Sequence, residues 1–316
     1  MSKKNFWLVI GAIIIAVGGY IGFNAWQSTG QDAKTQDGPL KELRIQFVPS
    51  SQADKMEART KPLEKLLSKE LNMPVHVSVS TDYNTVVEAL GSKQIDLGFL
   101  PPHPYVYAHE KYGAEVLLQA QRYEMDSKKN DGSQTDELTG SYRGVVLVKK
   151  DSDIKSPEDL KGKSIAVQNT TSDSGFIFQT VDLDKEDKLN VLKDSKLVTV
   201  KGHDQGILSV LNGDTDAAFV FEEARNIVKP DHPTVYEDTR VIKYTQPIPN
   251  DNITIRSGIS AEDTQKIQDA MMTIFNEDEE GKQVMKDVYR WLGVTKSSDK
   301  NYNIVREYQD YIDNMK

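Results

Sequence analysis

The feature of this sequence that most limits its fold is a regular alternation between short β-type runs and helical patterns. Residues 43–47 alternate apolar and polar side chains, residues 60–72 place leucines on one helical face, and residues 75–79 alternate again. Strict alternation is typical of a half-buried strand, whereas apolar residues three or four apart are typical of an amphipathic helix. Strands interleaved with helices in this way indicate α/β layers.

The alternation falls into two series separated by a polar stretch. The first series continues through a helix near residues 82–90 and a strand at 95–100, which stops at Pro101 because proline cannot donate to a sheet ladder. Residues 124–140 are polar, do not place the ligands of a calcium loop in register, and are interpreted as a solvated loop. The second series predicts strands at 142–148, 164–167, 198–200 and 216–221, with helices that begin near Ser156, Asp173 and His203.

Two α/β series followed by helical patterns predict a two-lobed fold with a hinge and a central cleft. We expect lobe 1 to contain residues 41–140 and 252–316, and lobe 2 to contain residues 141–251. Ligands of open α/β sheets bind beyond the carboxyl ends of the strands, near helix N-termini. A ligand is therefore expected between the lobes, in a cleft that closes by hinge motion.

Residues 6–26 form an uncharged, largely apolar stretch that follows Lys3 and Lys4. A helix of this length rises about 1.5 Å per residue and spans a hydrocarbon layer of ~30 Å. Lysines before the stretch place the rest of the chain outside the cell by the positive-inside rule. We expect residues 1–26 to be an uncleaved transmembrane anchor and 27–40 a polar linker. The alternative is a cleaved signal peptide, although such peptides usually have a shorter apolar region and a clear small-x-small site.

The charge of the chain argues against nucleic acid as a partner. The net charge is -9, and removing the +2 of Lys3 and Lys4 leaves -11 on everything after them. An acidic body repels phosphate backbones and anionic lipid surfaces. An anionic ligand must therefore be held by local dipoles and hydrogen bonds.

The absence of cysteine excludes disulfides, thiolate metal sites, cysteine nucleophiles and a lipid-modified cysteine. The five histidines show no metal-binding spacing, and the chain has no GxSxG or Walker motif. We therefore expect no metal, no cofactor and no enzymatic activity.

Four strand-to-helix junctions carry hydroxyls or a histidine where a helix N-terminus is expected. They are Ser50-Ser51, Thr81-Asp82-Tyr83, residues 170–175 and Gly202-His203-Asp204. Backbone N–H groups and hydroxyls at such a junction form a nest for a tetrahedral oxyanion. Each junction taken alone is also explained by helix capping.

At these junctions the sequence resembles a known family, the phosphate/phosphite/phosphonate substrate-binding proteins of ABC importers. The resemblance covers about residues 41–300. It implies a type II periplasmic-binding fold, in which two α/β lobes are joined by two crossing hinge strands and hold the ligand between them. The matching stretches, in order, are LRIQFVPS, TDYNTVVEAL, DLGFLPPHPYVYA, SYRGVVLVKKDSDIKSPEDLKGKSIA, TTSDSGF, GHDQGILSVLNGDTDAA and QPIPNDNITIR.

The resemblance also implies a set of ligand-binding residues. Ser172 and Ser174 would hydrogen-bond the phosphorus oxygens, together with the N–H groups of that helix start, and His203 would donate to the oxyanion. Tyr83 and Tyr105 would line the opposite lobe.

Two acidic positions of the family are matched by Glu223 and Asp251. In relatives that bind aminoalkylphosphonates, these positions can hold the ligand's ammonium group. Two carboxylates suit a buried cation, because an isolated buried charge is costly.

One residue departs from the family pattern Ser-Thr-Ser-Gly, since Asp173 stands between Ser172 and Ser174. A carboxylate beside a dianion is repulsive, so Asp173 would accept a hydrogen bond from a protonated ligand oxygen and favour a monoanion. Alternatively, Asp173 only caps the helix and faces away from the ligand.

Four of the other site residues also have purely structural interpretations. Tyr105 follows a proline cluster and is also explained as a buried aromatic, and His203 is also explained as a helix cap. Glu223 lies beside another glutamate and fits a solvated surface, and Asp251 fits an ordinary turn.

These observations predict an extracytoplasmic substrate-binding component of an ABC importer. It would bind a phosphonate, phosphite or phosphate ion in the cleft between its lobes and deliver it to the permease and its ATPase. We expect a monomer attached to the cell membrane by the N-terminal helix. The alternative function is a tethered ligand-sensing module of a signalling system on the same fold, because cleft closure serves transport and signalling equally.

Overall fold

The structure is a computed structural model that describes residues 38–48, 53–80, 82–126, 128–129 and 131–315. The expected anchor at residues 1–26 lies outside the described residues, as do nearly all of the linker, the Ser50-Ser51 junction and Thr81. In the described ranges, no helix has both the length and the apolar character that crossing a membrane requires.

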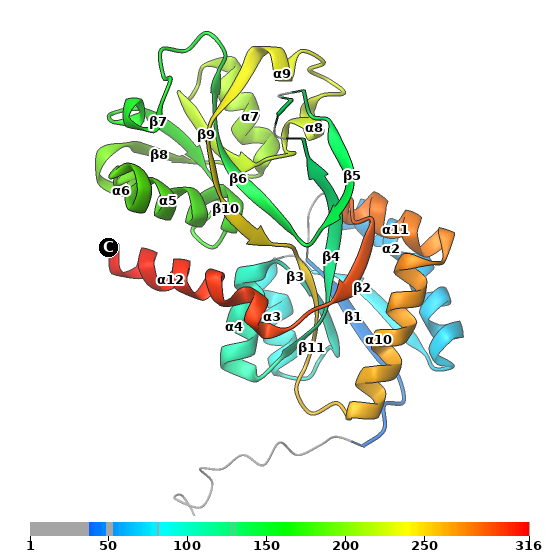
Figure 1. Cartoon of the computed structure of the whole chain (residues 1–316). Helices are drawn as coiled ribbons and strands as arrows, with labels where there is room; N and C mark the ends of the chain where they lie inside the picture. The colour runs from blue at the N-terminus through cyan, green and yellow to red at the C-terminus, as the bar shows by residue number, and fades with distance from the viewer. Residues whose placement is uncertain (1–37, 49–52, 81, 127, 130, 316) are drawn as a thin grey trace, which may run out of the picture. The chain divides into compact units, whose positions relative to one another are not determined.

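Most of the first sheet lies in the lower half of Figure 1, and its path runs in the order β12-β4-β11-β3-β1-β2. β5 pairs with β4 and extends into the upper half of the view. β1 is parallel to β2 and β3, whereas β11 is antiparallel to β3 and β4. The strands are β1 (Leu43–Phe47), β2 (Val75–Val79), β3 (Leu97–Leu100), β4 (Glu115–Met125), β5 (Gln134–Thr139), β11 (Asn252–Ile255) and β12 (Gly293–Lys296). The accompanying helices are α2 (Ala53–Leu71), α3 (Tyr83–Gly91), α4 (Pro102–Tyr112), α10 (Ala261–Asn276) and α11 (Glu279–Tyr289).

The alternation seen in the sequence explains how this sheet is held. Leu43, Ile45 and Phe47 are at most 1% exposed, and the polar residues between them are partly exposed. The buried side chains pack in one apolar cluster with residues of α2, α10 and α11. Within this cluster the rings of Phe47 and Phe99 stack with centroids 4.0 Å apart. The predicted α/β layering is therefore confirmed for this part of the chain.

The second sheet lies in the upper half of Figure 1 and has the strand order β10-β6-β9-β7-β8. β7 is parallel to β8 and β9, and β6 is antiparallel to β9 and β10. The strands are β6 (Ser141–Lys149), β7 (Ser164–Val167), β8 (Lys196–Thr199), β9 (Ala217–Phe221) and β10 (Thr239–Pro249). Helical segments are η1 (Pro157–Leu160), η2 (Asp173–Ile177), α5 (Phe178–Asp187), α6 (Val191–Asp194), α7 (His203–Asn212), α8 (Arg225–Val228) and α9 (Val235–Asp238).

The chain passes between the two sheets at two points that lie side by side. It leaves the first sheet at Gly140, between β5 and β6, and returns through Asn250 and Asp251, between β10 and β11. The N–H of Asn250 donates to the carbonyl of Gly140 at 2.8 Å, and its side-chain amide donates to the carbonyls of Ala120 and Thr139. These bonds fix the crossing and bring Asp251 next to both sheets.

Two of the sequence predictions are corrected here. The interpretation of residues 124–140 as a loop is wrong at both ends, because β4 continues to Met125 and β5 pairs with it. The strand signal was hidden because β5 is mostly exposed and has no apolar face. The helix predicted from Ser156 is only a single 3₁₀ turn, although its capping box with Asp159 is present.

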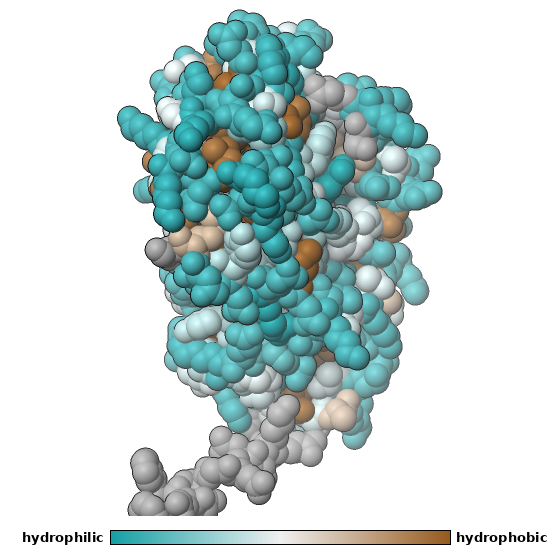
Figure 2. All heavy atoms as spheres, turned by 60° about the vertical axis from the view of Figure 1, so that its left-hand side comes forward, coloured by the Kyte–Doolittle hydropathy of each residue, from teal (hydrophilic) through white to brown (hydrophobic). Residues whose placement is uncertain are grey.

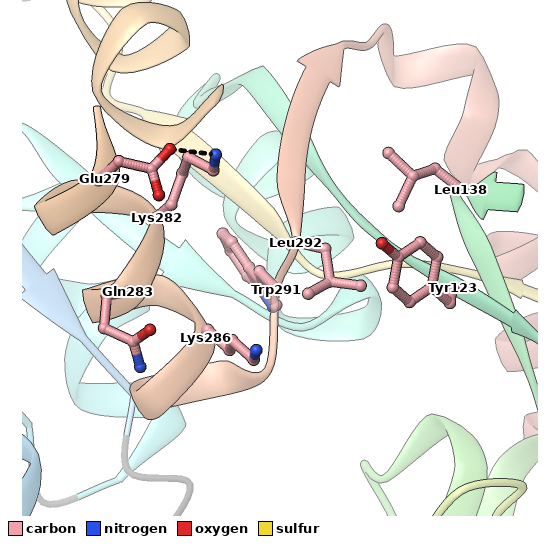
Figure 3. Close-up of a pocket in the computed structure, with 8 residues that line it drawn as sticks. All are labelled: Tyr123, Leu138, Glu279, Lys282, Gln283, Lys286, Trp291 and Leu292. Atoms are coloured by element: carbon pink, nitrogen blue, oxygen red, sulfur yellow. Dashed lines mark hydrogen bonds and ion pairs between the residues drawn. The ribbon is translucent and has the colours of Figure 1, made fainter. Parts of the chain in front are cut away.

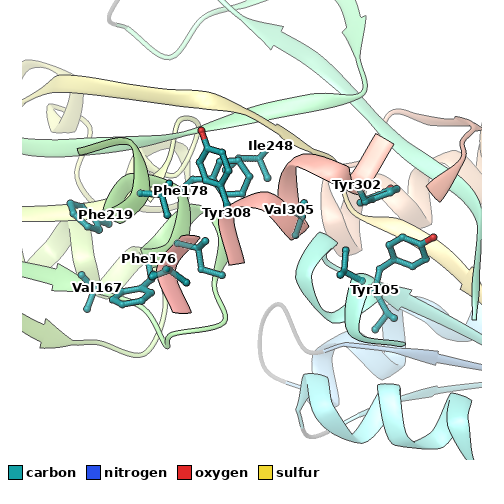
Figure 4. Close-up of a cluster of buried hydrophobic side chains, with 14 of the residues drawn as sticks. Tyr105, Val167, Phe176, Phe178, Phe219, Ile248, Tyr302, Val305 and Tyr308 are labelled. Carbon is teal, nitrogen blue, oxygen red and sulfur yellow. The ribbon is translucent and has the colours of Figure 1, made fainter. Parts of the chain in front are cut away.

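The C-terminal helix α12 (Asn303–Met315) packs against helices associated with both sheets. Tyr308 stacks on Phe178 of α5 with ring centroids 4.2 Å apart, and Tyr302, just before α12, meets Tyr105 of α4 edge-on at 4.6 Å (Figure 4). All four rings belong to one apolar cluster. On the face shown in Figure 2, by contrast, hydrophobic side chains are scattered in small groups among hydrophilic ones.

Candidate functional site

Asp173 connects the start of η2 to the start of α4. Its Oδ2 accepts the backbone N–H of His103 at 3.2 Å, although the two residues are 70 positions apart. Asp173 is 4% exposed, and its Oδ1 has no hydrogen-bond partner among the described residues. Burial raises the pKa of Asp173 to about 7, with a further contribution from Asp251, while the His103 N–H opposes the shift. The Asp173 side chain therefore reaches across to α4, and the N-cap position of its own helix belongs to Ser172.

Ser172 and Ser174 flank this carboxyl group and differ in burial. Ser174 is 5% exposed, and its hydroxyl interacts with the hydroxyl of Tyr142 on β6, whereas Ser172 is partly exposed. Burial raises the pKa of Tyr142 well above its ordinary value, with the carboxylates of Asp251 and Asp173 acting in the same direction. Tyr142 therefore remains a neutral hydroxyl that can donate a hydrogen bond.

Tyr83 belongs to the same group of residues although it comes from the first sheet's side of the molecule. It is the first residue of α3, and Asp82 caps that helix by accepting the N–H of Thr85 at 2.9 Å, which agrees with the capping interpretation of the Thr81-Asp82-Tyr83 junction. Burial, together with Asp251 and Asp173, raises the pKa of Tyr83 to about 12. The tyrosine is therefore a second neutral hydroxyl near the same carboxylates.

Glu223 and Asp251 are joined by an arginine that the sequence analysis did not single out. Arg122, on β4, places Nη1 3.3 Å from Oε2 of Glu223 and Nη2 3.5 Å from Oδ2 of Asp251. Its guanidinium also lies over the ring of Tyr142, 5.6 Å from the centroid. Burial disfavours the charge of Arg122, but the two carboxylates outweigh this effect and raise its pKa. Glu223 is 6% exposed, so its interpretation as a solvated surface charge is wrong.

His203 begins α7 and is tied to the Ser172–Gly175 turn through Gln168. The side chain of Gln168 exchanges two hydrogen bonds with the backbone of Gly202. The backbone N–H of Gln168 donates to the carbonyl of Gly175. A Cβ at Gly175 would lie 2.1 Å from Cγ of Gln168, so this approach requires glycine. Burial lowers the pKa of His203 to about 4, so the imidazole is neutral at neutral pH. Its Nδ1 is buried and has no partner among the described residues.

Tyr105 is placed differently from the other predicted residues. It is completely buried, its hydroxyl donates to Asp299 at 2.8 Å, and its ring packs against Tyr302 and His109. In this arrangement Tyr105 fills the apolar cluster beside α12, which corresponds to the packing interpretation of this residue.

We refer to seven of these residues as the central cluster. Two of them, Arg122 and Tyr142, were missed by sequence reasoning, as was Gln134 of β5, which donates to Oε1 of Glu223 at 2.9 Å. The cluster combines neutral hydroxyls, one guanidinium and three carboxyl groups, and its members are buried or partly buried. It consists of Tyr83, Arg122, Tyr142, Asp173, Ser174, Glu223 and Asp251.

A surface pocket of about 240 Å³ is lined by residues outside the central cluster. It lies between α11 and the β4–β5 hairpin, and none of the central cluster lines it (Figure 3). Its walls include Trp291, Tyr123 and Leu138, with charged side chains from α11.

The fold and the cluster together define a class of protein. Two α/β sheets joined by two adjacent crossings, with hydroxyl donors gathered beside the second crossing, correspond to a type II periplasmic-binding fold. A family model described as "ABC transporter, phosphonate, periplasmic substrate-binding protein" matches residues 45–302. This chain belongs to that family of periplasmic substrate-binding proteins of phosphonate ABC transporters.

Known proteins similar to this chain agree with that family. The phosphate-import protein PhnD of Mycolicibacterium smegmatis is 27% identical over 60% of this chain, which spans 57% of that relative's length. The phosphonates-binding periplasmic protein of Escherichia coli is 24% identical to this chain. The match covers 82% of this chain and 73% of the length of that protein. The structure of PhnD1 from Prochlorococcus marinus in complex with methylphosphonate has a TM-score of 0.67 and 19% identity, over 86% of this chain and 98% of that chain. This last likeness concerns the fold.

Proposed function

We propose that this protein binds a phosphonate, phosphite or phosphate ion in its central cluster and delivers it to an ABC permease. The observation that carries the proposal is the convergence of buried and partly buried hydroxyl donors at the crossing of the two sheets. The hydroxyls of Ser174 and Tyr142 come from the second sheet's side, and Tyr83 comes from the first. Neutral hydroxyls and a neutral His203 are well suited to a tetrahedral oxyanion, because they donate hydrogen bonds without a global positive field.

We propose two lobes built on the two sheets, residues 41–140 with 252–316 and residues 141–251. The ligand would then bridge residues of both, as hinged binding proteins do. Ser172, Ser174 and His203 would bind it from lobe 2, and Tyr83 from lobe 1. Tyr105 would support α4 through Asp299 without touching the ligand.

Asp173 has a specific part in this proposal. One of its oxygens is used by His103, which leaves Oδ1 for a ligand oxygen. With a pKa of about 7, the carboxyl group exists in both protonation states near neutral pH. It would accept a hydrogen bond from a protonated monoanion when ionised, or donate one when neutral.

The place of action is also part of the proposal. The uncharged stretch at residues 6–26 supports attachment to the membrane by an N-terminal helix, with the binding domain on the extracytoplasmic side. We further propose that the protein acts as a monomer.

The decisive experiment is calorimetric titration of the purified full chain with phosphate, phosphite and methylphosphonate, with sulfate as the control anion. A ligand at a hundred times its Kd stabilises the folded form by about 2.7 kcal/mol, so the melting temperature should rise with the same ligands. If none of the three phosphorus ions produces heat or a thermal shift, the proposed function is wrong.

A further inference from the structure

The central cluster contains a cation and two carboxylate partners that all come from the chain itself. Arg122 contacts two carboxylates that lie 101 and 129 positions away in the sequence, one after β9 and one at the second crossing between the sheets. The side chains of Arg122, Glu223 and Asp251 are 13%, 8% and 23% exposed. The three charges are therefore mostly removed from water and depend on one another.

The acceptors that a second cation would need are largely taken. Oε1 of Glu223 accepts the amide of Gln134 at 2.9 Å, and Oε2 faces Arg122. Oδ2 of Asp251 also faces Arg122. The guanidinium is fixed from a further side by the ring of Tyr142. A ligand ammonium between these carboxylates would have to displace the guanidinium.

Displacement of Arg122 is unfavourable for a physical reason. A buried guanidinium that loses its partners keeps its charge, because arginine does not deprotonate in proteins. An ammonium that enters without displacing it would face a like charge at short range in a medium of low polarity. The two carboxylates therefore serve the protein's own cation.

We propose that Arg122 is a specificity-determining residue that occupies the cation position between Glu223 and Asp251, so that the site takes phosphorus oxyanions without an amino group. This inference rests on the proposed function and narrows it to phosphate, phosphite and simple alkylphosphonates. Aminoalkylphosphonates, which carry a cation of their own, are disfavoured. The alternative expectation, that Glu223 and Asp251 hold a ligand ammonium, applies only to a chain without this arginine.

The test compares two phosphonates of nearly equal size, propylphosphonate and 2-aminoethylphosphonate, which differ mainly by a methyl group in place of an ammonium. Calorimetry on the full chain should show 2-aminoethylphosphonate binding at least about 10-fold more weakly than propylphosphonate. Arg122→Gln should shift the ratio of the two Kd values by about 10-fold or more toward the amine, and Arg122→Lys should preserve the wild-type ratio.

Arg143→Gln is the matched control, because Arg143 also pairs with a glutamate and lies over a tyrosine ring but is outside the central cluster. It should leave the ratio unchanged. Tighter binding of the amine by the wild-type chain overturns the inference, as does an unchanged ratio in Arg122→Gln. If Arg122→Gln does not fold, the wild-type ratio alone decides. Failure of methylphosphonate, phosphite and phosphate to bind at all would instead overturn the proposed function.

Discussion

Arg143 and Arg122 each contact glutamate and lie over a tyrosine ring, but their contacts differ in length and in the number of partners. The difference helps to distinguish a structural ion pair from one in a proposed ligand site. Arg143 and Glu222 both belong to the second sheet's side, and their side chains meet at 3.0 and 3.1 Å, with a third bond of 2.9 Å from the Arg143 N–H. The guanidinium of Arg143 lies 4.4 Å from the ring centroid of Tyr244. The contacts of this pair are short, and its partners lie on the neighbouring strand β6 and directly after β9 of the same sheet.

Arg122 has longer contacts, at 3.3 and 3.5 Å, and its guanidinium contacts two carboxylates, Glu223 after β9 and Asp251 at the second crossing. Its Nε is buried without a partner among the described residues. A donor left free in a buried cluster is costly in a purely structural ion pair, whereas it is useful where a ligand oxygen binds. The free donor of Arg122 therefore agrees with the proposal that the ligand binds in the central cluster.

The largest expected effect comes from breaking the Arg122 arrangement. Glu223→Ala removes one of the two carboxylate partners of the mostly buried Arg122, and it also removes the acceptor of the Gln134 amide. Removal of one partner of a buried ion pair costs about 3 kcal/mol or more. Urea unfolding followed by circular dichroism measures this loss, and phosphonate affinity should fall with it. A loss below about 1 kcal/mol would show that the pair is effectively solvated.

The next prediction concerns Asp173, a carboxyl group of the same cluster without an arginine contact in the structure. Its pKa is raised from 3.8 to about 7 in the folded protein, so the folded form binds more protons than the unfolded form between these values. Its contribution to stability is therefore present at low pH and is lost as the pH rises from about 4 to about 7, by at most about 1.4 kcal/mol per pH unit.

Asp173→Asn removes this titration. The free energy of unfolding of the variant should therefore fall less than that of the wild type as the pH rises from about 4 to about 7. His203 acts in the opposite direction below about pH 6.5, because its pKa is lowered to about 4. It remains in both proteins, so the difference between their unfolding curves isolates Asp173. Parallel curves from pH 4 to pH 7 would show that the carboxyl group is not held neutral by burial.

A third prediction addresses the role of Asp173 toward the ligand. Asp173→Thr restores the family pattern and removes the group that would favour a protonated ligand oxygen. We expect the preference between phosphate and methylphosphonate, and its dependence on pH, to change by a few-fold in calorimetry. An unchanged order and pH profile would limit Asp173 to its contact with His103.

The smallest effect is expected at the comparison pair. Glu222→Ala should reduce stability by about 1 kcal/mol, because Arg143 is 28% exposed and can turn to water. Ligand affinity should remain within about twofold of the wild type. A large loss of affinity in this variant would mean that the two pairs are coupled through their adjacent residues, Glu222 and Glu223.

The sequence predicted those parts of the site that follow from local pattern. Ser172, Ser174 and His203 stand at strand-to-helix junctions, and each junction forms where the apolar alternation ends. A cap at the Thr81-Asp82-Tyr83 junction could be predicted because capping needs only the next three residues, and the structure assigns this role to Asp82. These features depend on neighbours in the chain and are visible without the fold.

Arg122 and Gln134 could not be found in this way. Arg122 lies near the polar end of β4, and its role depends on partners more than a hundred positions away. Gln134 reaches Glu223 only because β5 pairs with β4. β5 has no apolar face from which a strand could be predicted. The role of Asp173 was equally hidden, since its partner His103 is brought to it only by the two sheets meeting.

The contact between Asp173 and His103 has a consequence for measurement. Positions 101, 102 and 104 are prolines, so His103 carries the only backbone N–H in the stretch from 101 to 104, and Asp173 accepts it. Any motion that separates η2 from the start of α4 breaks this bond and exposes that proton to water. The deuterium exchange rate of this single amide would therefore report how often η2 and the start of α4 separate, without any attached label.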